Sequence, residues 1–70
     1  MSGLREEDYR GHRICVEADK RRPNAWGWSY LIDEEVAGQS APTLFMFSMD
    51  VALRFGMIAA QTRVDQMERK

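Results

Sequence analysis

The chain has 70 residues, of which 44% are hydrophobic, 30% charged and 10% aromatic, and its formal net charge at pH 7 is −1. This length excludes a second domain, and the hydrophobic and aromatic fractions exclude a disordered chain. The sequence has no apolar run long enough for a membrane span, and its start, with Glu6, Glu7 and Asp8, is too polar for a signal peptide. A single cysteine, Cys15, forms no internal disulfide, which favours a cytoplasmic location.

Residues 1–8 show no apolar periodicity, so we expect a flexible lead-in there and a single α+β domain over residues 9–70. Ordering 70 residues costs roughly 105 kcal/mol, at about 1.5 kcal/mol per residue. One small core barely offsets that cost. We therefore expect association to add stability.

Two segments alternate between apolar and polar side chains, as half-buried strands do. In residues 9–18 the apolar positions are Ile14, Val16 and Ala18. The charged residues 19–24, closed by a proline, predict a hairpin turn. In the second segment one face carries Trp26, Trp28, Tyr30 and Ile32. These two faces are expected to pack together against a helix.

A third extended region spans residues 36–47 and is interrupted by Gly38 and Pro42, which predicts either one bent edge strand or two short strands. A helix is predicted from Ser48, the N-cap, to about Met67, with Asp50 in its first turn. The order of elements predicts an α+β fold. In this fold a three-stranded antiparallel sheet is followed by one C-terminal helix packed on one face (β-β-β-α).

The predicted helix carries apolar residues on two opposite sides. The longer stripe, expected to face the sheet, contains Met49, Leu53, Gly56, Met57, Ala60, Val64 and Met67. The second set is Val51, Phe55 and Ile58, and one sheet cannot cover both sides. Three alternatives follow. Phe55 folds over the edge of the sheet or meets Phe45 and Phe47, the second set is an interface, or it is simply exposed.

The sequence offers little for catalysis or metal binding. His12 and Cys15 are the only histidine and cysteine, and on a regular strand they point to opposite faces, so we expect no catalytic residues and no enzyme. They cannot supply the four ligands of a structural zinc ion, and the carboxylates at residues 6–8 and 33–35 lack the spacing of a calcium loop. We expect no metal and no cofactor.

A cluster of basic residues lies before and within the predicted hairpin turn. It contains Arg10, Arg13, Lys20, Arg21 and Arg22, against only two acidic residues, Glu17 and Asp19. A basic hairpin tip beside aromatic side chains is typical of nucleic-acid contacts. Three interpretations remain open, namely a solvated turn, a nucleic-acid contact and a contact with an acidic partner.

Three segments resemble known proteins: Tyr9-Arg10-Gly11, residues 26–32 and residues 48–65. In them the chain resembles small uncharacterised β-β-β-α proteins of Burkholderia- and Ralstonia-type bacteria, a resemblance that implies no activity. The layout of strands and helix, with Ser48, Ala52 and Leu53 at the helix start, is also similar to the HicB antitoxin family. That resemblance implies a partial double-stranded-RNA-binding-like fold.

Together these patterns predict a small domain that acts by protein association, as a homodimer or with another protein, without membrane contact. The expected interface is Val51, Phe55 and Ile58. The alternative function is a nucleic-acid-binding or antitoxin-like module that uses the basic hairpin tip.

Overall fold

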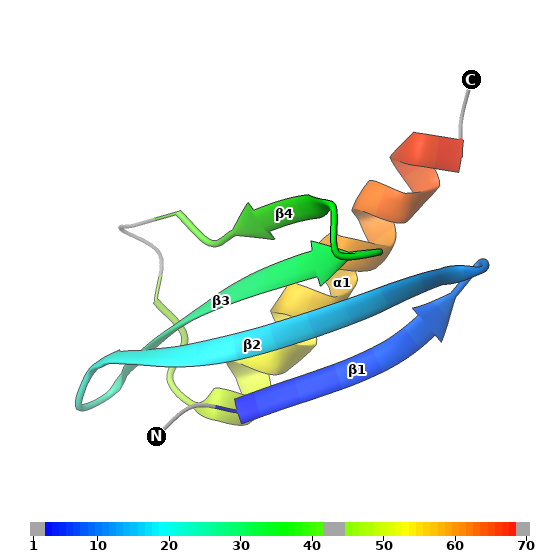
Figure 1. The fold of residues 1–70 in the computed structure, drawn as a ribbon. Helices are drawn as coiled ribbons and strands as arrows, with labels where there is room; N and C mark the ends of the chain where they lie inside the picture. The colour runs from blue at the N-terminus through cyan, green and yellow to red at the C-terminus, as the bar shows by residue number, and fades with distance from the viewer. Residues whose placement is uncertain (1–2, 42–44, 69–70) are drawn as a thin grey trace.

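In the computed structural model, which describes residues 3–41 and 45–68, four strands precede one helix. The elements are β1 (Gly3–Tyr9), β2 (His12–Arg22), β3 (Ala25–Ile32), β4 (Val36–Gln39) and α1 (Met49–Glu68). Each strand pairs antiparallel with its neighbour in sequence, in the order β1-β2-β3-β4. Figure 1 shows α1 lying across one face of this sheet. The α+β class and the C-terminal helix are confirmed, but the sheet has four strands instead of three.

The additional strand is β1, and the expected lead-in over residues 1–8 is wrong for the residues that the structure describes. All of β1 pairs with β2, from Gly3 opposite Ala18 to Tyr9 opposite His12. Its charged residues 5–8 are exposed, so no apolar pattern marked this segment as a strand. Arg10 and Gly11 form the connecting turn with positive φ angles of 52° and 81°, as the central residues of a two-residue hairpin turn require. Residues 1 and 2 lie outside the described part.

The charged segment after Ala18 is also more ordered than expected. We predicted a turn over residues 19–24, but β2 continues to Arg22, and the turn contains only Pro23 and Asn24. A β-bulge between Lys20 and Arg22 lets the strand stay paired while its register with β3 shifts. The hairpin therefore extends as a paired ribbon with a short tip.

Of the two alternatives for residues 36–47, the structure shows two short pieces. The first is β4, and the second is an isolated bridge in which Met46 pairs with Trp26 through two backbone hydrogen bonds of 2.8 and 2.9 Å. Pro42 lies outside the described residues. Ser48 caps α1 as predicted, because its Oγ accepts a hydrogen bond from the Val51 backbone N–H at 3.3 Å.

The core lies between α1 and the face of the sheet that the helix covers, here called the inner face. Its buried side chains come from β2, β3 and α1: Ile14, Val16, Ala18, Ile32, Ala52, Leu53, Met57, Ala60 and Val64. Gly56 is the point of closest approach. A Cβ atom at Gly56 would lie 2.5 Å from Cγ1 of Val16 and 3.1 Å from Cβ of Trp28. The predicted stripe therefore faces the sheet from Leu53 to Val64, and its glycine permits the contact. Met67, predicted in the same stripe, is exposed, whereas Ala52, which was not predicted, is fully buried.

Replacing Gly56 with alanine tests this contact. Alanine favours a helix by about 1 kcal/mol, but the added methyl group would overlap Val16, and overpacking costs about 1–3 kcal/mol. We expect Gly56→Ala to lower the free energy of unfolding, measured by urea denaturation. The Gly56→Ala/Val16→Ala double variant should lose less than the sum of the two single variants. A more stable Gly56→Ala protein would contradict the close approach.

Candidate functional site

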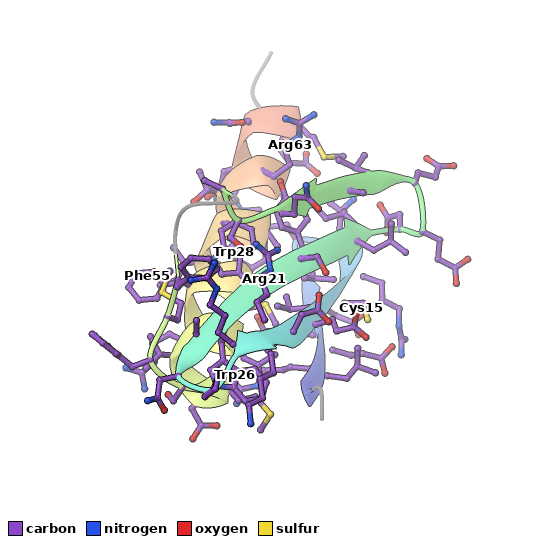
Figure 2. All side chains as sticks on the ribbon, turned by 90° about the vertical axis from the view of Figure 1, so that its left-hand side faces the viewer. Cys15, Arg21, Trp26, Trp28, Phe55 and Arg63 are labelled. Carbon is purple, nitrogen blue, oxygen red and sulfur yellow. The ribbon has the colours of Figure 1, made fainter. Side chains whose placement is uncertain are left out.

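The side of α1 that faces away from the sheet is apolar along its middle. Phe55 is 48% exposed and Ile58 is 52% exposed, and Val51 on the same side is half-buried. We call these three residues the outer stripe. Phe55 is not among the residues packed in or against the core, so it does not fold over the sheet edge into the core. Figure 2 shows Phe55 beside α1 and Cys15 on the far side of the sheet.

The outer stripe continues through polar groups that are already satisfied. Thr62 follows Ile58 by one helical turn, and its hydroxyl donates a hydrogen bond to the Ile58 carbonyl oxygen at 2.8 Å. The hydroxyl can therefore enter a contact without leaving an unpaired donor. At the other end, Phe47 lies just before the N-cap and is 88% exposed. Phe47 is therefore a further exposed apolar side chain, outside the three residues of the outer stripe.

The structure divides the five predicted basic residues into two groups. Arg10 and Arg13 lie at the β1–β2 end, where Arg10 Nε is 3.3 Å from Asp65 Oδ1 and Arg13 Nη2 is 3.5 Å from Glu6 Oε2. The other three lie at the far end of β2, roughly 23 to 30 Å from Arg13 at about 3.3 Å per residue of strand. The five residues therefore do not form one surface.

The second group, Lys20, Arg21 and Arg22, lies at the β2–β3 hairpin. Within the described residues, none of the three forms an ion pair with a carboxylate. The Arg22 guanidinium carbon lies 5.9 Å from the ring centre of Phe45, within the range of a cation–π contact. Arg21 covers the backbone at Gly27, where an added Cβ would lie 2.6 Å from the guanidinium carbon. The hairpin cations thus lie against β3 and the Phe45 segment.

The aromatic side chains of β3 are not the most exposed rings near these cations. Trp28 and Tyr30 are partly buried against the core and stack on each other, with ring centres 6.0 Å apart. The exposed rings belong instead to Phe45, at 39%, and Phe47, at 88%. Sequence reasoning missed these residues as partners of the hairpin, because only the Met46–Trp26 bridge brings them to it.

A polar cluster that the sequence analysis did not identify surrounds His12. Its Nδ1 lies 2.5 Å from Asp33 Oδ2 and its Nε2 lies 2.7 Å from Glu68 Oε1. The hydrogen bond to Asp33, followed by the one to Glu68, raises the pKa of His12, and the His12 hydrogen bond lowers the pKa of Asp33. With an acceptor at each ring nitrogen, the ring donates twice as an imidazolium. The cluster joins the start of β2, the β3–β4 turn and the end of α1.

Cys15 lies on the opposite face of the sheet from His12, as expected. It is half-buried in a shallow hollow that is also lined by Glu6, Arg13, Leu31 and Glu34. Burial raises the pKa of the Cys15 thiol, which keeps it protonated at neutral pH. The imidazole of His12 lies across the sheet, so the two side chains do not form a thiol–imidazole pair.

Two features are absent from the part of the chain that the structure describes. It holds no group of three or more His, Cys, Asp or Glu side chains arranged to bind a metal ion. Its helix, although 20 residues long, is not apolar enough to cross a membrane. Comparison of the chain with protein-family models, curated proteins and solved structures found no match.

The His12 cluster predicts how stability depends on pH. Because folding raises the pKa of His12 above 6.5, its contribution is complete below about pH 6.5 and is lost as the pH rises through the folded-state pKa. The lowered pKa of Asp33 acts in the opposite direction, since its contribution exists above about pH 3.8 and disappears on acidification. We expect the free energy of unfolding to fall from pH 6 towards pH 9, at about the range where histidine titrates.

Urea denaturation of wild type and His12→Gln at several pH values measures this effect. His12 is the only histidine, so its replacement should flatten the decline above about pH 6. Asp33→Asn should flatten it as well, because it removes the negative charge that favours the protonated form of His12. If the free energy of unfolding falls equally steeply with pH in wild type and in His12→Gln, protonation of the cluster does not contribute to stability.

Proposed function

We propose that this domain acts in the cytoplasm by self-association, as a homodimer formed through the outer stripe of α1. The supporting observation is the exposure of Phe55 and Ile58, both about half accessible, in the middle of a helix whose opposite side is fully occupied by the core. Clustered apolar side chains on a small domain are typical of interaction sites.

The spacing of the outer stripe supports a second copy of the chain as the partner. Together with Thr62, which continues the outer stripe by one turn, its residues follow one another as Val51, Phe55, Ile58 and Thr62 at intervals of four, three and four residues. This spacing reads the same in both directions, as a two-fold contact between antiparallel helices requires. In such a pair Phe55 faces the Ile58 position of the partner, and Val51 faces its Thr62 position. The Phe55 ring would then contact the Ile58 side chain of the other copy, and Val51 would contact the methyl-bearing side chain of Thr62.

The shape of the domain also favours association. Its accessible surface is 4972 Å², whereas a folded monomer of 8.1 kDa exposes about 4,500 Å². The excess arises because the molecule is elongated, with extents of 40 × 20 × 17 Å. The helix is about 30 Å long, which gives a partner helix room to cover the whole outer stripe. A partner helix would cover apolar surface that one sheet leaves open.

The proposal includes no catalytic activity. The histidine is held between two carboxylates, and the cysteine lies on the other face of the sheet with a raised pKa. Association is the role that the described residues support best.

Replacing Phe55 with glutamate tests the dimer. Near a two-fold axis the substitution brings two like charges into an apolar contact, which costs several kcal/mol when they are buried. We expect wild type to sediment as a dimer and Phe55→Glu as a monomer of 8.1 kDa. The melting temperature should depend on protein concentration only for wild type.

Gln39→Glu is the matched control, because it adds the same charge at an exposed position on β4, away from α1. It should leave both the mass and the melting temperature as in wild type. A wild-type monomer at high micromolar concentration would refute the proposal. So would a Phe55→Glu protein that is less stable but still dimeric.

A further inference from the structure

The β2–β3 hairpin places three consecutive cations at one end of the long axis of the molecule. Lys20, Arg21 and Arg22 form no ion pair within the described residues. The acidic residues 33–35 lie in the β3–β4 turn, at the other end of the sheet. The net charge of −1 therefore hides a separation of charge along the molecule. A polyanion would be attracted to the hairpin end and repelled from the other.

Exposed aromatic rings lie beside these cations. Met46 is fixed to Trp26 by two backbone hydrogen bonds and packs against the core, while its neighbours Phe45 and Phe47 are exposed. The Phe45 ring lies 5.9 Å from the guanidinium carbon of Arg22. The rings are therefore held next to the cations by backbone pairing.

Only small residues lie on the surface between the cations and the rings. On β3 it is formed by Ala25, which pairs with Arg22, and by Gly27, which Arg21 covers. No large side chain of β3 rises at these two positions. Arg21, Arg22, Phe45 and Phe47 together are called the hairpin surface.

Guanidinium groups beside open aromatic rings match the chemistry of an unpaired nucleic-acid strand. Phosphates contact the cations, and bases stack on the rings, because every base has an aromatic face. In a duplex the base faces are covered by neighbouring pairs. An acidic protein would use the cations but leave the phenylalanine rings without a matching partner. We propose that the hairpin surface binds single-stranded nucleic acid, an activity separate from self-association because it shares no residue with the outer stripe.

The test uses the full chain and a fluorescein-labelled thymidylate oligomer of about 12 nucleotides, a length within the range of small single-strand sites. Fluorescence anisotropy should show binding at low salt. The affinity should fall with salt with a log–log slope of about −2, as expected when Arg21, Arg22 and the neighbouring Lys20 each contact one phosphate of a single strand. Absence of binding at low salt would overturn the proposal.

Two variants separate the cations from the rings. Arg21→Gln/Arg22→Gln should weaken binding at least tenfold and make the salt slope shallower by about 1.4, because two phosphate contacts are lost. Phe45→Leu should weaken binding about tenfold without changing the slope, because stacking does not release counterions. If Phe45→Leu binds as wild type does, the rings take no part and the proposal is wrong.

The matched control is Arg10→Gln/Arg13→Gln, which removes the same charge at the other end of β2, where both arginines face carboxylates. It should change the affinity less than about twofold. An equal loss in this control would show attraction without a defined surface. If duplex DNA binds as tightly as the single-stranded oligomer, or if polyglutamate displaces the oligomer as well as unlabelled oligomer does, the cations serve another class of partner and the proposal is wrong. Phe55→Glu should still bind the oligomer, so failure of the dimer and failure of this site are distinguishable.

Discussion

The close contact between α1 and the sheet at Gly56 determines how this domain can be built. A Cβ atom there would lie 2.5 Å from Val16, so any larger residue would force the helix away from the strands. Ala52 and Ala60, one turn before and one turn after, are also fully buried and small. This line of small residues lets a single helix lie close to β2 and β3. It also fixes the rotation of α1, which leaves Phe55 and Ile58 on the side away from the core.

Beyond that contact, polar side chains attach the first hairpin to the helix. The Tyr9 hydroxyl donates a hydrogen bond to Asp65 at 3.0 Å, and Gln61 donates one to Glu7 at 2.7 Å. The His12 cluster adds a bond to Glu68 in the last turn of α1. Therefore β1 is held by backbone pairing and by side-chain hydrogen bonds, with few buried apolar groups of its own.

The strands β2 and β3 are held by buried apolar side chains, whereas β1 is held by backbone pairing and polar contacts. This difference explains which parts of the molecule could be predicted from the sequence. Apolar alternation in β2 and β3, and the helical stripe through Leu53 and Val64, record burial directly, so both were predicted. In β1 the residues that pair are charged and exposed, so no pattern marked the strand. The hairpin cations were identified but were grouped with Arg10 and Arg13, because neighbours in sequence are far apart on an extended strand. Phe45 reaches the hairpin through a bridge between distant residues, which no local pattern records.

The order of elements has a consequence for synthesis of the chain. All four strands form hairpins with their sequence neighbours, which close within about 1–10 μs. Their inner face stays uncovered until α1 emerges, because Ile32 ends the core of the sheet and Val64 ends that of the helix. At roughly 5–20 residues per second, a ribosome needs about 2–6 seconds for that interval. During this time the charged outer edge of β1, residues 5–8, opposes pairing with strands of other nascent chains.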